Sequence, residues 1–94
     1  MLYMVIERFE PGRQDEIYRR VREHGRRLPD GLEYVASWVE IGFERCFQVM
    51  RCDDPELLFG WIADATDVCR FEVVPVLDST TVQALMSARG RPPG

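Results

Sequence analysis

The chain has 94 residues, of which 46% are hydrophobic and 30% charged, and its formal net charge is -4. This balance is typical of one soluble globular domain and excludes a disordered chain. The acidic net charge argues against nucleic-acid binding, and no apolar run approaches the about 18 residues that cross a bilayer. The first residues do not form a signal peptide, so we expect a cytoplasmic protein without membrane contact. The three cysteines, an odd number, favour reduced thiols.

The first two elements are predicted to be a strand and a helix. Residues 2–9 are apolar and bounded by Pro11-Gly12, which is typical of a strand. A helix is expected over residues 13–28, with one inward stripe at a 3.6-residue period formed by Ile17, Val21, His24 and Leu28. Residues 13–27 hold six arginines against three acids. Acids four residues before arginines favour a self-paired, solvated face over an anion-binding patch; these pairs are Asp15–Arg19, Glu16–Arg20 and Glu23–Arg27.

The next two elements, residues 32–41 and 45–52, are predicted to form a β-hairpin. Glycine in Gly42-Phe43 indicates a two-residue type II′ turn. In that register Glu40 faces Arg45, which pairs opposite charges. The same register places Trp38 opposite Phe47 and Ser37 opposite Gln48.

The remaining elements are a helix, a strand and a short terminal helix. Asp54 is a suitable N-cap before Pro55, and the apolar stripe that follows consists of Leu58, Trp61, Ile62 and Ala65. Residues 70–77 form the last strand, which Pro75 assigns to a sheet edge. Ser79 or Thr80 is expected to cap a helix through Met86. The predicted organisation is therefore one domain over residues 1–78, then a short helix and a flexible tail over residues 79–94.

This order predicts an α+β fold, the ferredoxin-like βαββαβ arrangement with a four-stranded antiparallel sheet and two helices on one face. Strand alternation divides the side chains between two faces. The face expected under the helices carries Leu2, Met4, Ile6, Tyr34, Ala36, Trp38, Phe47, Val49, Phe71 and Val73. The face expected to be open carries Tyr3, Val5, Glu7, Val35, Ser37, Val39, Cys46, Gln48, Met50, Glu72, Val74 and Val76. Because the second set is also largely apolar, we expect a second copy of the chain to cover it, giving a homodimer.

Cys46 and Cys52 stand six residues apart in one expected strand, about 20 Å at about 3.3 Å per residue, so they cannot form a disulfide with each other. Gln48 between them points to the expected dimer space. It is expected to hydrogen-bond across the dimer, and the alternative is that it forms one wall of a ligand cavity.

Four segments, "MLYMVIERF", "YVASWVE", "RCFQVMRCDDPELLFGWI" and "FEVVPV", resemble a bacterial domain-of-unknown-function family, family 3303, within the dimeric α/β-barrel superfamily. The resemblance covers the chain to about Leu77 and implies two sheets paired as a barrel. The superfamily includes cofactor-free monooxygenases, haem-degrading enzymes, lactone isomerases and ligand-sensing modules. Haem-degrading members use an asparagine and a later histidine, whereas this chain has no asparagine and no histidine after residue 24. A haem-degrading enzyme is therefore not expected. No cofactor is expected.

Several residues are candidates for chemistry. His24 is the only histidine and the candidate general base, with a half-buried structural histidine as the alternative. Trp38, Tyr34 and Trp61 could line a pocket, although aromatic residues at such spacing are usually core. Glu7 and Glu72 are expected on neighbouring strands, where paired carboxylates offer acid–base chemistry or else meet arginines at the rim. No metal site is expected, because the candidate ligands project to opposite sides of the sheet.

Two functions agree with this sequence. The first is a homodimer that binds a small, mostly apolar molecule, as an enzyme of the cofactor-free oxygenase or isomerase kind. The second is a non-catalytic ligand-sensing or protein-interaction module. The candidate pocket residues are Trp38, Tyr34, Gln48, Glu7 and Glu72, with His24 as the catalytic residue.

Overall fold

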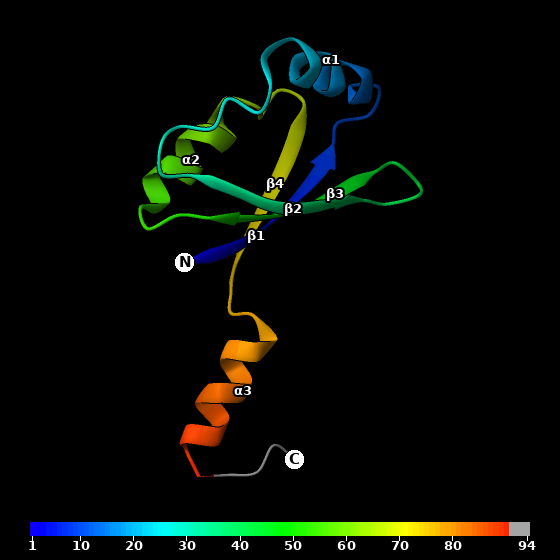
Figure 1. The fold of residues 1–94 in the computed structure, drawn as a ribbon. Helices are drawn as coiled ribbons and strands as arrows, with labels where there is room; N and C mark the ends of the chain where they lie inside the picture. The colour runs from blue at the N-terminus through cyan, green and yellow to red at the C-terminus, as the bar shows by residue number, and fades with distance from the viewer. Residues whose placement is uncertain (91–94) are drawn as a thin grey trace.

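The computed structural model describes residues 1–90 of the chain. Its elements in chain order are β1 (Leu2–Phe9), α1 (Gln14–His24), β2 (Glu33–Val39), β3 (Arg45–Arg51), α2 (Pro55–Ala63), β4 (Cys69–Val76) and α3 (Ser79–Ala88). The four strands form one antiparallel sheet in the order β2-β3-β1-β4 (Figure 1). The predicted α+β class and four-stranded antiparallel sheet are confirmed, and β4 with Pro75 lies at a sheet edge. Part of the predicted tail, residues 91–94, lies outside the described residues.

The hairpin has the predicted register but a different turn. Trp38 pairs with Phe47, Ser37 pairs with Gln48, and the Glu40 N–H donates to the Arg45 carbonyl at 2.9 Å. The type II′ prediction is wrong, because the positive φ of 59° falls on the residue after Gly42. This conformation is unfavourable for a bulky side chain such as phenylalanine. The packing of that ring, Phe43, against Phe9 and Tyr18 offsets the cost.

The first helix is shorter than predicted and its ion pairs differ. α1 ends at Gly25, whose φ of 65° suits glycine, and does not continue to residue 28. Glu16 bonds Arg20 as predicted, at 3.0 Å. Arg19 instead bonds Glu16 and Glu23, each at 2.6 Å. The expectation of a self-paired face therefore holds for these arginines, whereas Arg27 lies beyond the helix.

Aspartates cap the other two helices. The Glu56 N–H donates to the Asp54 side chain at 2.9 Å at the start of α2, as predicted. For α3, the cap is Asp78, which accepts from the Thr81 N–H at 2.7 Å. The prediction of Ser79 or Thr80 as cap is wrong by one residue or two, because the carboxylate immediately upstream takes the position. No helix within residues 1–90 combines the length and apolarity needed to cross a bilayer.

Replacing Asp54 with alanine should lower the free energy of unfolding by about 1 kcal/mol, because the first turn of α2 loses its side-chain acceptor. Asp54→Ser keeps a capping oxygen and is the matched control. Urea unfolding followed by circular dichroism measures both variants. Equal losses for alanine and serine would contradict the capping role.

The helices cover the face that the sequence assigned to the dimer. The strand residues Tyr3, Val5, Cys46, Gln48 and Met50 are buried, and they pack with residues of α2 and of the segments beside the helices. The predicted assignment of faces is therefore wrong for these strands. It rested on giving the more apolar set to the helices, whereas Glu7, Ser37 and Gln48 of the other set line a cavity on the helix side.

The predicted alternation of side chains is also wrong in β2 and in β4, and residues that were predicted to share a face lie on opposite faces. A register shift between Tyr34 and Ala36 places Tyr34 on the covered face, while Trp38 stays beside Phe47 on the open face. The alternation of β4 also differs from the prediction. Phe71 pairs with Glu7, and Glu72 pairs with Ile6. Glu7 and Glu72 thus lie on opposite faces of the sheet and do not form the predicted carboxylate pair.

The open face of the sheet is apolar, and no element of residues 1–90 packs across it (Figure 1). Trp38 at 59% and Val74 at 38% are exposed, and the central residues are half-buried by one another. The open face is defined here by its apolar residues Leu2, Met4, Ile6, Ala36, Trp38, Phe47, Val49, Val74 and Val76, together with Glu72 opposite Ile6. Apolar surfaces of this kind are typical of interaction sites in other proteins.

α3 projects from the end of β4 away from the sheet and the other helices (Figure 1). None of its residues is buried, and its larger apolar side chains, Val82, Leu85 and Met86, are exposed.

Candidate functional site

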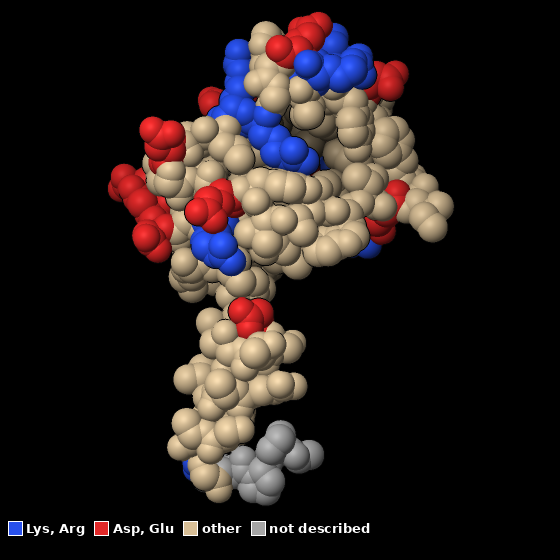
Figure 2. Space-filling view, in the orientation of Figure 1, with Lys and Arg blue, Asp and Glu red and all other residues tan. Residues whose placement is uncertain are grey.

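A cavity of about 490 Å³ lies between α1 and the covered face of the sheet. Figure 2 shows the hollow beneath α1, with arginine side chains along its margin. Each strand contributes two residues to the lining, and α1, the end of α2 and the segment before β4 close the other sides. Much of the wall is apolar, with Phe9, Ile17, Val68 and Phe71 among its members. The volume suits a small organic ligand.

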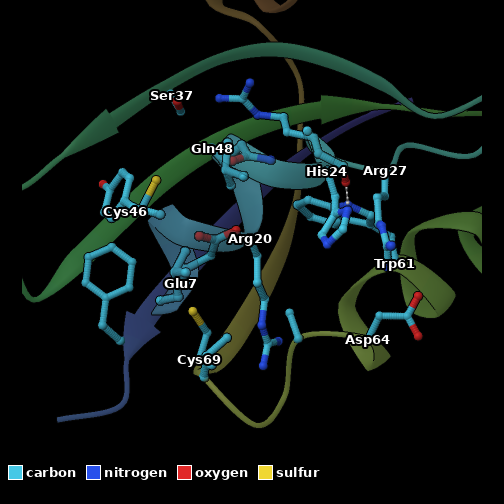
Figure 3. A pocket seen from close by; sticks show the side chains of 18 of the residues that line it. Glu7, Arg20, His24, Arg27, Ser37, Cys46, Gln48, Trp61, Asp64 and Cys69 are labelled. Atoms are coloured by element: carbon cyan, nitrogen blue, oxygen red, sulfur yellow. Dashed lines mark hydrogen bonds between the residues drawn. The ribbon is translucent and has the colours of Figure 1, made fainter. Parts of the chain in front are cut away.

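Glu7 is the carboxyl group on the floor of this cavity. It stands on β1 between Cys46 of β3 and Phe71 of β4 (Figure 3). Burial raises the pKa of Glu7 to about 7, against the opposing positive charge of Arg26. The protonated and ionised forms therefore coexist near neutral pH, which is the condition for efficient proton transfer in either direction.

Gln48 lies beside Glu7 on the cavity floor and is 5% exposed. Its amide Nε2 donates to the sulfur of Met50 at 3.0 Å, and a thioether is a weak acceptor. Among residues 1–90 this is the amide's only hydrogen bond with another side chain. The amide therefore retains hydrogen-bonding capacity for a molecule in the cavity.

Two cysteines, Cys46 and Cys69, complete the polar part of the floor, and both are free. Burial raises the pKa of Cys46 to about 11 and that of Cys69 to about 12, so both are neutral thiols at physiological pH. β1 lies between their strands, which places them about 10 Å apart, too far for a disulfide. They act as small apolar walls and not as nucleophiles.

The helix that covers the cavity, α1, contacts the rest of the domain at several points. Arg20 of α1 makes two hydrogen bonds to Asp67, at 3.1 and 2.6 Å. Beyond the end of α1, the carbonyl of Arg26 accepts from the Trp61 Nε1–H at 2.8 Å. Near the start of α1, Tyr18 stacks on Phe43 of the hairpin with ring centroids 5.7 Å apart.

Of the six predicted catalytic and pocket residues, the structure places three in the cavity lining and three outside it, and Trp61, the further aromatic candidate, also lines the cavity. Glu7, His24 and Gln48 line the cavity. His24 is at its margin, with Nε2 3.7 Å from a carboxylate oxygen of Glu23 and a side chain that is 47% exposed. The other three do not line it. Trp38 and Glu72 are on the open face, and Tyr34 lies beside the cavity, where its hydroxyl bonds the Ser37 hydroxyl at 2.7 Å.

Arg26 lines the cavity and is a candidate residue that the sequence did not single out. Its guanidinium carbon lies 3.9 Å from the centre of the Tyr34 ring, a cation–π contact. The arginine-rich run was assigned as a whole to a solvated helix face, but α1 ends before this residue. Gly25, a helix-ending residue directly before it, was the available signal.

One comparison with known proteins assigns the chain to a family. The family model described as Domain of unknown function (DUF3303) matches residues 1–90. The chain belongs to this family. The match confirms the resemblance to family 3303, and the matched range of DUF3303 includes the cavity, α3 and every candidate residue. No curated protein and no solved structure matches the chain.

Proposed function

We propose that the chain binds a small, mostly apolar molecule in the cavity and transfers a proton to or from it, as an enzyme of the cofactor-free oxygenase or isomerase kind. The observation that carries this proposal is a glutamate in a largely apolar cavity of about 490 Å³ whose pKa lies near 7. Perturbed carboxyl groups in clefts are characteristic of acid–base sites.

The reaction class follows from what Glu7 can accept. Ionised Glu7 takes a proton from a C–H bond next to a carbonyl group, and the electron pair of that bond remains on the substrate as an enolate. In an isomerase, Glu7 returns the proton to a different carbon of the same molecule. In an oxygenase, the enolate instead donates electrons to dioxygen, which is then the co-substrate. Both reactions begin with the same proton transfer.

The two other predicted residues have separate roles in this proposal. His24 at the cavity margin is the second acid–base group, in reach of solvent. Gln48 on the floor orients the ligand through its amide. The non-catalytic ligand-sensing module remains the alternative, and it predicts binding without proton transfer.

The test is hydrogen–deuterium exchange at the carbon acid of 2-tetralone, followed by NMR in D₂O. The protein should accelerate exchange, and Glu7→Gln should reduce the catalysed rate at least tenfold, because it removes the proton acceptor. Val21→Trp should also reduce it, since Val21 lines the cavity and is 40% exposed.

The matched control is Val82→Trp, the same change on α3 at a side chain that is 42% exposed. This variant should keep the wild-type exchange rate. Binding of 2-tetralone without faster exchange would support the ligand-sensing alternative. A rate that survives both Glu7→Gln and Val21→Trp would remove the cavity from the reaction.

We further propose that two copies join through their open faces as a homodimer, the dimeric α/β barrel of the ferredoxin-like fold. The strand order β2-β3-β1-β4 with α1 and α2 on one side supports the ferredoxin-like assignment. The exposed Trp38 and the apolar residues around it support the pairing of open faces. The partner in this proposal is therefore the chain itself, with no nucleic acid and no membrane.

A further inference from the structure

The charges at the cavity are not evenly compensated. Arg19 is paired with Glu16 and Glu23, and Arg20 with Glu16 and Asp67. Among residues 1–90 these arginines therefore have carboxylate partners, whereas Arg26 and Arg27, which also line the cavity, make no ion pair. A cation without a counter-ion beside an apolar cavity is an attractive position for an anionic group.

Arg26 is held in place from two directions. Its carbonyl accepts from the Trp61 Nε1–H at 2.8 Å, and its guanidinium stacks on Tyr34 at 3.9 Å. The positive charge of Arg26 also acts on the floor of the cavity. It opposes the larger effect of burial on the pKa of Glu7 and of Cys46, although Arg26 makes no hydrogen bond to either side chain. A guanidinium stacked on an aromatic ring loses less freedom when a ligand binds than one that makes no contact.

We propose that Arg26 is the oxyanion-binding residue of the cavity, and that the ligand is a mostly apolar molecule with one oxyanion, of the enolate, phenolate or carboxylate class. The stacked guanidinium takes the oxyanion, and the Gln48 amide is a second donor on the floor. The inference rests on the proposed function, because the enolate that proton transfer would generate belongs to this class.

The charge balance ties this site to Glu7. With an anion on Arg26, an ionised Glu7 adds a second negative charge to the cavity, whereas a protonated Glu7 does not. Above pH 7, a stable anion should therefore bind together with a proton, which Glu7 takes up. The result is an anion beside a protonated Glu7, the same charge state that proton transfer from a neutral substrate produces. The other titratable groups on the lining are Tyr18 and His24 of α1, Cys46 of β3 and Cys69 of β4, besides Asp64 and the arginines.

The test compares 2-naphthoate with its neutral analogue 2-naphthamide by isothermal titration calorimetry at pH 8. The wild-type protein should bind the carboxylate at least tenfold more tightly than the amide. Arg26→Gln should remove this preference and retain binding of 2-naphthamide. Arg22→Gln, a loss of positive charge on α1 outside the cavity lining, should leave the preference intact. Thermal unfolding checks that both variants are folded.

Proton uptake is measured by repeating the titration of 2-naphthoate in two buffers with different ionisation enthalpies. The wild-type protein should take up close to one proton, and Glu7→Gln should take up much less, which separates Glu7 from His24. Equal affinity for the two probes, or an anion preference that survives Arg26→Gln, would overturn the inference and leave ligand binding in the cavity standing. Failure of both probes to bind would overturn the proposed function as well.

Discussion

Replacing Glu7 with glutamine should raise the free energy of unfolding by about 3 kcal/mol at pH 8 and by less than about 1 kcal/mol at pH 4.5. Burial raises the pKa of Glu7 from 4.5 to about 7, so the folded protein holds this proton more tightly than the unfolded chain does. The stability that protonation provides is fully present below the unfolded pKa. It is lost as the pH rises from about 4.5 to 7, when the folded protein must ionise a carboxyl group that is partly shielded from water.

Glutamine cannot ionise, so the variant avoids that loss. Urea unfolding of both proteins across this pH range gives the difference, in which the other titrating groups cancel. The control is Glu44→Gln, at an exposed residue of the hairpin, which should show no such pH-dependent difference. If Glu7→Gln and the wild type differ by a constant amount between pH 4.5 and 8, then Glu7 is not a buried acid of raised pKa.

A residue that destabilises the fold at neutral pH needs a reason to be there. In the covered layer of this sheet, a leucine or methionine of similar size would avoid the ionisation cost, as Met50 does nearby. Sites with a chemical role are where proteins commonly accept such a loss. If Glu7→Gln raises the free energy of unfolding and also abolishes catalysed proton exchange, the same carboxyl group is responsible for the stability cost and for the reaction.

Replacing Phe47 with aspartate should weaken the proposed homodimer at least about 1,000-fold, which corresponds to about 4 kcal/mol. Phe47 is central to the open face, paired with Ile6 on one side and Trp38 on the other. In a two-fold dimer each substitution occurs twice, so two apolar contacts are lost and two carboxylates are buried without partners.

Sedimentation velocity over a concentration series measures this change. The wild-type protein should sediment as a dimer at micromolar concentration and Phe47→Asp as a monomer with an unchanged circular dichroism spectrum. Phe59→Asp is the matched control, since Phe59 is 75% exposed on α2 and away from the open face. A monomeric wild-type protein would overturn the dimer, and a dimer that tolerates Phe47→Asp would assign it to another surface.

Local chemistry was sufficient to predict most of the elements. The Asp54 cap before a proline, the edge position of Pro75 and the Glu40–Arg45 cross-strand pair each depend on residues that are close in the chain or directly opposite. The register of the hairpin followed from that pair even though its turn was wrong. The turn depends on Phe43, whose left-handed conformation is stabilised by tertiary packing that no local rule contains.

The assignment of faces failed because both faces of the sheet are apolar, so hydrophobicity alone could not rank them. The better signal was the set of polar residues, Glu7, Ser37 and Gln48, which line a cavity and so require the helix side. The register shift after Tyr34 was invisible in the sequence pattern and moved Tyr34 to the covered face, whereas Trp38 lies outside the predicted site because its whole face is the open one. Arg26 was missed because it depends on where α1 ends.

The helix that covers the cavity is much less buried than the strands that form its floor. No residue of α1 is buried, whereas the strands beneath it hold Val5 and Met50 at 0% exposure. Lifting this helix would uncover little hydrocarbon and break a few polar links such as Arg20–Asp67. The proposed ligand would therefore need only a local opening of α1 to enter, while the sheet that carries Glu7 stays folded.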